Sequence, residues 1–103
     1  MDPRRRRVIW SPEAQRDLGA AIQFIAAKSP QGARSVLDAV LGTAESLSTL
    51  SSRGRVVPEL GGPGYREVFV FRYRLMYRTT NGVVEIVAFL HGAQDFRSLS
   101  GAG

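Results

Sequence analysis

The chain has 103 residues, of which 44% are apolar, and a formal net charge of +5. This length suits one compact domain with a single core. The sequence contains no cysteine and one histidine. That composition excludes disulfides and thiolate metal sites, and it leaves too few ligands for an all-protein zinc site. We therefore expect neither a metal nor another cofactor.

Thirteen of the 14 basic residues are arginine. Arginine binds carboxylate and phosphate groups through two parallel hydrogen bonds and stacks on rings. The excess of positive charge favours a polyanionic partner, either a nucleic acid or an acidic protein segment. No apolar run approaches the roughly 20 residues that span a bilayer, and the start "MDPRRRR" lacks the hydrophobic segment of a signal peptide. We expect a soluble cytoplasmic protein without membrane contact.

Residues 1–7 are interpreted as a basic, flexible leader, and residues 8–10 as a short first strand. Two helices should follow. Ser11 suits an N-cap and Pro12 the first helical position, and Ser29-Pro30 ends the first helix and starts the second. Because the link between them is short, the helices should form an antiparallel hairpin.

Apolar residues recur at helical spacing in both helices and predict two buried stripes that form core. The stripes consist of Ala14, Leu18, Ala21, Ile22 and Ile25, and of Ala33, Val36, Leu37, Val40, Leu41, Ala44 and Leu47. Residues 51–64 are rich in glycine and proline and predict a loop. Its glycines do not predict a phosphate-binding loop, because no Gly-Lys-Ser/Thr sequence follows them.

Residues 65–91 predict strands, and Asn81-Gly82 is typical of a two-residue hairpin turn. In that register Thr80 pairs with Val83. One face should then pack on the helices; it carries Thr79, Tyr77, Leu75 and Tyr73 opposite Val84, Ile86, Ala88 and Leu90. The opposite face carries Arg78, Met76, Arg74 and Arg72 opposite Glu85, Val87, Phe89 and His91.

On this second face Arg78 and Glu85 should form a cross-strand ion pair. The remaining arginines lie among apolar and aromatic side chains, a mixture that suits a binding surface better than a merely solvated one. Arg66, from the preceding strand, is expected to face the same open surface.

The order of strand, helical hairpin, basic loop and three strands resembles the RelE/ParE superfamily of bacterial toxins over residues 8 to about 97. The segments "YRE" (65–67), "YRLMY" (73–77), "VEIVAFLHG" (84–92) and "AQDF" (93–96) carry the resemblance. It implies an α+β fold, with an N-terminal strand and an α-helical hairpin packed on one face of a twisted antiparallel β-sheet. Residues 8–97 would form this domain, and residues 98–103 a flexible tail.

The superfamily has two branches. RelE-like members cut messenger RNA on the ribosome without a metal, and here Arg66, Arg74 and His91 would supply that chemistry. The sequence departs from the RelE pattern at three places. Val68 stands where a second basic residue is expected, "GAQD" (92–95) stands where a basic cluster is expected, and "FRSLSGAG" (96–103) lacks the expected terminal helix and tyrosine. ParE-like members instead bind and inhibit DNA gyrase, and "LHGAQDF" is similar to that branch.

The leading hypothesis is therefore a ParE-like toxin of a type II toxin–antitoxin system, without a favoured catalytic residue. Its partners would be DNA gyrase and a cognate antitoxin with an acidic amphipathic segment. The expected target- or antitoxin-binding residues are Arg66, Arg72, Arg74, Met76, Phe89, His91, Gln94 and Phe96. The alternatives are a RelE-like ribosome-dependent mRNA endoribonuclease, a nucleic-acid-binding module without toxicity, and a decayed toxin that keeps only antitoxin binding.

Overall fold

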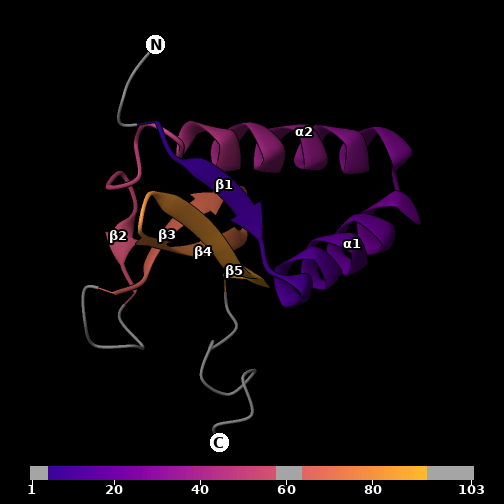
Figure 1. The fold of residues 1–103 in the computed structure, drawn as a ribbon. Coiled ribbons are helices and arrows are strands. Elements are labelled where there is room, and N and C mark those ends of the chain that lie inside the picture. The colour runs from indigo at the N-terminus through magenta and orange to yellow at the C-terminus, as the bar shows by residue number, and fades with distance from the viewer. Residues whose placement is uncertain (1–4, 58–63, 93–103) are drawn as a thin grey trace, which may run out of the picture.

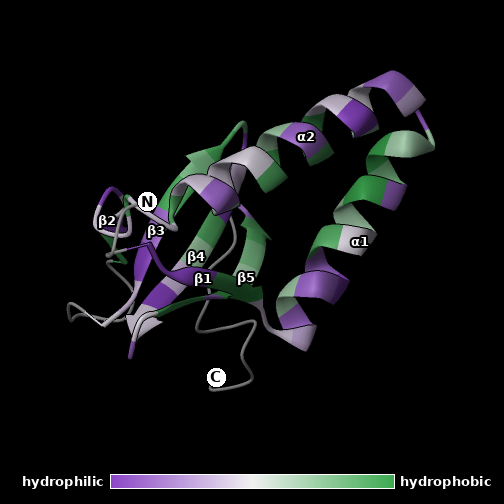
Figure 2. Ribbon diagram, turned by 45° about the horizontal axis from the view of Figure 1, so that its top comes forward, coloured by the Kyte–Doolittle hydropathy of each residue, from purple (hydrophilic) through white to green (hydrophobic). Residues whose placement is uncertain are grey.

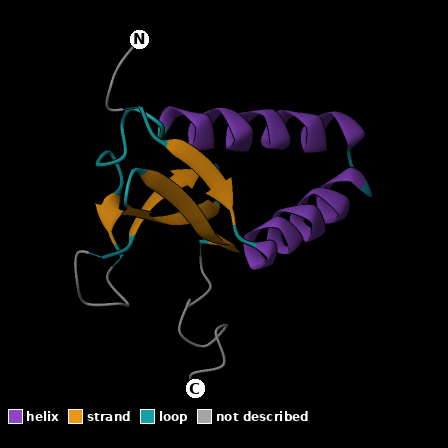
Figure 3. Cartoon of the chain, in the orientation of Figure 1, coloured by secondary structure: helices purple, strands orange, loops and turns teal. Residues whose placement is uncertain are grey.

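The fold was obtained from a computed structural model, which describes residues 5–57 and 64–92. Along this part of the chain one strand is followed by two helices and then by four strands (Figures 1 and 3). In chain order they are β1 (Arg7–Trp10), α1 (Pro12–Ala26), α2 (Pro30–Ser46), β2 (Arg55–Val56), β3 (Arg66–Val70), β4 (Tyr73–Thr80) and β5 (Val83–His91).

The strands form one sheet in the order β1-β5-β4-β3-β2. Strand β1 runs parallel to β5, and the other neighbours are antiparallel. The helices lie on one side of this twisted sheet, and the open end of their hairpin faces it (Figure 1). The predicted α+β fold is therefore confirmed, and the sheet is mixed because its edge strand β1 is parallel.

Both helices begin as the sequence predicts. The Ser11 hydroxyl accepts a hydrogen bond from the Ala14 N–H at 3.1 Å, and the Ser29 hydroxyl accepts one from the Gly32 N–H at 2.9 Å. Each serine precedes a proline, which fits the first helical turn because it has no N–H to leave unpaired. Hydrophobic and hydrophilic segments alternate along both helices in Figure 2, as in amphipathic helices.

The main core fills the space between the helices and the sheet. The helices contribute Ala14, Val40, Ala44 and Leu47, and the strands contribute Val68, Val70, Leu75, Tyr77, Val84, Ile86 and Phe89. Helix α1 is also tied to β5 by hydrogen bonds, since the Ser11 N–H donates to the Ile86 carbonyl at 2.9 Å. The start of α1 is thereby fixed beside the point where β1 ends.

Three residues of the predicted leader contact the folded domain. Arg7 belongs to β1, which begins one residue earlier than predicted. The Arg6 N–H donates to the Ser48 carbonyl at 2.7 Å, and Arg5 forms an exposed ion pair with Glu45 at 2.8 Å. The leader therefore follows the C-terminal end of α2 from residue 5 onward.

Candidate functional site

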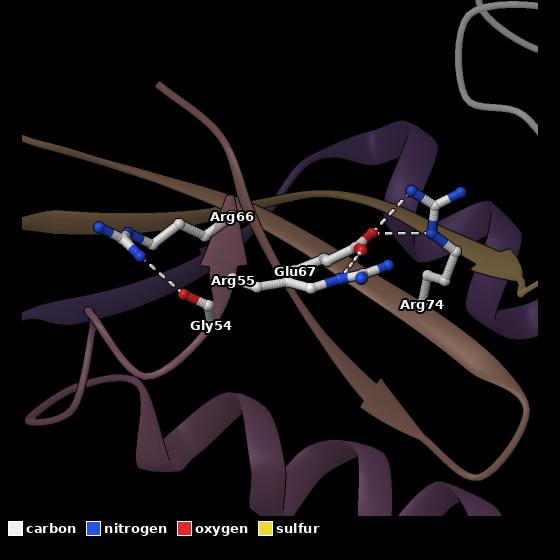
Figure 4. Close-up of polar contacts among 5 residues, drawn as sticks. All are labelled: Gly54, Arg55, Arg66, Glu67 and Arg74. Atoms are coloured by element: carbon white, nitrogen blue, oxygen red, sulfur yellow. Dashed lines mark hydrogen bonds and ion pairs between the residues drawn. The ribbon is translucent and has the colours of Figure 1, made fainter. Parts of the chain in front are cut away.

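A buried carboxylate organises the sheet face that lies away from the helices. Glu67, on β3, has a fully buried side chain and accepts hydrogen bonds from two arginines (Figure 4). One oxygen accepts from Arg74 Nε at 2.7 Å, and the other accepts from Arg55 Nε at 2.6 Å. Arg74 is itself buried, whereas 60% of the Arg55 side chain is exposed. The arrangement neutralises Arg74 within the protein and leaves Arg55 accessible.

The sequence does contain a signal for this cluster. Glu67 is followed by the apolar residues Val68, Phe69 and Val70 in a strand, and a buried acidic residue needs a cationic partner. The sequence analysis identified the arginines but not the carboxylate that holds them.

The basic loop before β2 is held by a second set of buried contacts. The Tyr77 hydroxyl donates to the Ser51 carbonyl at 2.7 Å and accepts from the Gly54 N–H at 2.9 Å. A Cβ at Gly54 would lie 2.6 Å from that hydroxyl, so only glycine allows this close approach. Burial raises the pKa of the Tyr77 phenol above its ordinary value. These contacts position the loop that carries Arg53 and leads into Arg55 of β2.

Arg66 lies on a different face of the sheet from Arg74. Arg66 pairs with Tyr77, and Arg74 pairs with Phe69. Because successive side chains of a strand alternate between faces, Arg66 lies on the same face as Val68, which is the face that the helices cover. Its Nη1 donates to the Gly54 carbonyl at 2.7 Å, and in Figure 4 it points away from the Glu67 cluster. The prediction that Arg66 and Arg74 share one face is wrong.

A β-bulge changes the predicted register of the hairpin. Strands β4 and β5 pair as predicted from Thr80 and Val83 to Tyr77 and Ile86, but the next pair is Met76 with Ala88. Val87 is therefore an extra residue in β5. An extra residue moves every later side chain of its strand to the other face. The pairs Arg74–Phe89 and Arg72–His91 that the sequence analysis predicted are thus wrong.

The shifted register places Phe89 and His91 on the face covered by the helices. The Phe89 ring stacks on the Tyr73 ring with 4.8 Å between centroids and an interplanar angle of 13°. The His91 ring lies edge-on to the Tyr73 ring, with 5.8 Å between their centroids and an interplanar angle of 77°. The prediction that Phe89 and His91 lie on the open face with Arg74 and Arg72 is therefore wrong.

Three of the expected contact residues are buried. Phe89 belongs to the main core, Arg74 is held by Glu67, and Met76 belongs to a smaller cluster on the opposite face of the sheet. That cluster also contains Val57, Ala88 and Leu90, with Tyr65 and Val87 packed against it. The centre of the face that was predicted to be open is thus largely buried. Phe89, Arg74 and Met76 therefore stabilise the sheet.

Other expected residues lie at the surface or outside the described part. Arg72 is exposed in the turn between β3 and β4, and Arg66 and His91 are partly to largely exposed. Gln94 and Phe96 fall outside the described residues. The predicted ion pair between Arg78 and Glu85 is confirmed, with Nε and Oε1 2.9 Å apart.

The helical hairpin carries an apolar groove that the sequence analysis missed. It lies between α1, α2 and β1 and is lined mainly by Ile9, Trp10, Leu18, Ile22, Leu37 and Leu41. Leu41 is 46% exposed and Ile9 is 37% exposed. The prediction that both helical stripes are wholly buried core is wrong for Leu41. The spacing of the apolar residues gave no signal for this groove, because their number is ordinary for a helix that packs on a core through one face.

Within residues 5–57 and 64–92, no group of three or more metal-binding side chains lies close enough together to hold a metal ion. The helices of this same part are too short or too polar to cross a membrane.

The fold is a helical hairpin on one face of a five-stranded mixed sheet, and the protein family follows from comparison with known proteins. The family described as "ParE toxin of type II toxin-antitoxin system, parDE" matches residues 8–96, and the chain belongs to this family. Among solved structures it resembles a chain of the "Chromosomal ParDE TA system from P. aeruginosa", with a TM-score of 0.70 and 16% identity. That likeness covers 85% of this chain and 97% of the other. No curated protein matches the chain.

Proposed function

We propose that this ParE-family toxin acts in the bacterial cytoplasm by binding and inhibiting DNA gyrase, and that a cognate antitoxin neutralises it. Membership of the ParE toxin family over residues 8–96 is the observation that carries this proposal. The positive charge of +5 favours acidic partner segments.

The positions of the basic residues favour binding over RNA cleavage. Metal-free cleavage requires a base, an acid and a cation around one phosphate. Arg74 is buried against Glu67 on one face of the sheet, whereas Arg66 and His91 lie on the other. Arg66 and His91 are also far apart on that face, because β3 pairs Arg66 with Tyr77 while β5 pairs His91 with Tyr73. The three residues therefore do not surround a common point.

The test compares two reactions with the purified chain. DNA gyrase supercoiling is measured with increasing toxin, and a reconstituted translation extract is assayed with the mRNA ends mapped. The proposal expects inhibited supercoiling and intact message. Codon-phased mRNA cuts with unaffected gyrase would support the RelE-like alternative, and loss of those cuts in His91→Ala would assign catalysis to that residue.

The apolar groove of the helical hairpin suits the antitoxin. An amphipathic helix binds a groove of this kind through its apolar face, and acidic residues on its polar face would complement the basic toxin. Leu37 and Leu41 on α2 and Ile22 on α1 supply the apolar lining. Arg66, Arg72 and His91 remain candidates for further antitoxin or target contacts.

The groove is tested with two matched leucines. Leu41→Glu introduces a charge into the groove, and Leu50→Glu does so at a leucine of similar exposure (55%) outside it. With the product of the neighbouring antitoxin gene, Leu41→Glu should raise the dissociation constant about tenfold or more. Leu50→Glu should leave it nearly unchanged. Equal effects of both substitutions would exclude the groove as the specific site.

A further inference from the structure

The turn between β3 and β4 holds a phenylalanine in a backbone conformation that bulky residues avoid. Val70 pairs with Tyr73, so Phe71 and Arg72 form a two-residue hairpin turn. Phe71 has a φ of 54°, whereas Arg72 has no positive φ. A turn with positive φ only at its first central residue normally carries glycine there. A phenylalanine at this position is strained, and such strain is often found at functional sites.

The strained residue displays its ring instead of burying it. Phe71 is 65% exposed, and Phe69, two residues earlier, is 51% exposed. The Arg55 guanidinium lies over the Phe69 ring, 5.4 Å from its centroid. Arg72, the second turn residue, is also exposed. We call this set of Arg55, Phe69, Phe71 and Arg72 the turn patch. In Figure 2 the end of β3, which leads into it, is hydrophobic.

The turn patch is held in place by contacts with the end of β5. The Gly92 N–H donates to the Arg72 carbonyl at 2.6 Å. A Cβ at Gly92 would lie 3.3 Å from Phe69 Cε2, so the ring rests against this glycine. Arg55 is held by its ion pair with the buried Glu67 carboxylate. Less side-chain entropy is then lost when a partner binds the patch, because the Arg55 and Phe69 side chains are already held in place.

We propose that the turn patch is the surface through which this toxin contacts its protein target. The proposal rests on the proposed function, in which that target is DNA gyrase. Aromatic and arginine side chains dominate the energetic centres of protein interfaces. The two rings require an apolar recess on the target, and the two guanidinium groups require carboxylates at its edge. The patch differs from the apolar groove, which has no cation among its lining residues.

The decisive substitution removes the ring and relieves the strain together. Phe71→Gly suits a positive φ, so the variant should unfold at the same or a higher temperature than the wild type. It should nevertheless raise the concentration needed for half inhibition of gyrase about tenfold or more. Phe71→Asn, which also tolerates positive φ, should behave in the same way. Phe71→Tyr keeps a ring and should retain inhibition.

Phe24 provides the matched control. It lies on α1 and is 64% exposed, close to the value for Phe71, so Phe24→Ala removes an equally exposed ring away from the turn. It should leave gyrase inhibition unchanged. If Phe71→Gly inhibits gyrase as strongly as the wild type, the turn patch is not the contact, although the proposed function would stand. If the wild type does not inhibit gyrase, the proposed function fails and this inference fails with it.

A nucleic acid is the competing occupant, since rings and arginines also bind bases and phosphates. Fluorescence anisotropy with a labelled single-stranded oligonucleotide and with a labelled duplex separates the two cases. If the patch contacts a protein, the wild type and Phe71→Gly should bind each nucleic acid with the same affinity. Tight binding of either probe that Phe71→Gly abolishes would overturn the proposal.

Discussion

Glu67 and Arg74 form an ion pair from which water is excluded: the carboxylate oxygen lies 2.7 Å from Arg74 Nη2, and the exposed fractions of the two side chains are 0% and 5%. Arg55 shares the same carboxylate through its second oxygen. A buried pair of this kind contributes little net stability relative to apolar packing, but removing one partner is costly because the remaining buried group loses a counter-charge. The pair therefore constrains which side chains β3 and β4 can carry.

Substitution of Glu67 by glutamine should destabilise the protein strongly. The amide preserves the shape of the side chain but removes the charge that balances Arg74. We expect the free energy of unfolding to fall by about 3 kcal/mol or more, measured by urea denaturation followed by circular dichroism.

Glu45→Gln is the matched control for this prediction. Glu45 also pairs with an arginine at 2.8 Å, but both side chains are more than half exposed. Removing such a surface pair should cost less than about 1 kcal/mol. Equal losses in the two variants would show that burial does not determine the importance of the Glu67 pair.

Local sequence signals predicted the helices and the hairpin turn, because each depends on a few neighbouring residues. Ser11 and Ser29 cap the helices, and Asn81-Gly82 forms the turn, with φ of 47° and 79°. The bulge at Val87 has no such signal. Its apolar neighbours satisfy either register, so only packing against the helices decides between them. The bulge at this single residue decides whether Phe89 and His91 lie on the same face of the sheet as Arg74 or on the face covered by the helices.

The candidate site was less predictable than the fold, since it depends on contacts between distant residues. The arginines were visible in the sequence, and Glu67 could be noticed there only as an acidic residue in an apolar strand. That it binds two of the arginines follows only once β2, β3 and β4 are adjacent. The turn patch escaped prediction because an unfavourable φ at Phe71 is a property of the folded backbone. Strained or functional positions of this kind are where local sequence rules are expected to fail.

Replacement of glycine by alanine should change the stability of the protein in opposite directions at Gly82, in the hairpin turn, and at Gly42, in α2. Gly82 has a φ of 79°, so Gly82→Ala should destabilise the protein by about 1 kcal/mol or more. Gly42 lies within α2, where a Cβ would meet nothing within 4 Å. Gly42→Ala should therefore stabilise the protein by roughly 0.5–1 kcal/mol. Thermal unfolding of both variants measures the difference, and a shift of the same sign in both would contradict the backbone argument.

Tyr77→Phe should loosen the loop that carries Arg53 and leads into Arg55 of β2. The substitution removes the hydroxyl that donates a hydrogen bond to the Ser51 carbonyl and accepts one from the Gly54 N–H. Leaving buried backbone groups unpaired costs about 1–3 kcal/mol. Amide hydrogen exchange should become faster at Gly54, and the free energy of unfolding should fall by this amount.

The same substitution predicts an effect at alkaline pH. Burial raises the pKa of the Tyr77 phenol above 10.0, so the folded state favours the protonated form. Its contribution to stability is fully present below pH 10.0 and is lost as the pH rises through the higher folded value. The stability difference between wild type and Tyr77→Phe should therefore shrink in that range. Tyr65→Phe, whose hydroxyl makes only a 3.5 Å contact with Arg78, is the control and should cost little.

Asp17→Asn should stabilise the protein at neutral pH. Asp17 lies on α1, and its partial burial raises the pKa of the carboxyl above 3.8, although a hydrogen bond from the Phe89 backbone opposes this shift. A raised pKa means that the folded state disfavours the charged form, so stability is lost as the pH rises through the folded value. The amide carries no charge, and its oxygen still accepts from Phe89. Its advantage over wild type, followed by thermal unfolding across pH, should be largest at neutral pH and disappear below 3.8, where the acid is also uncharged. An advantage that persists or grows on acidification would contradict the assignment of this effect to desolvation of Asp17.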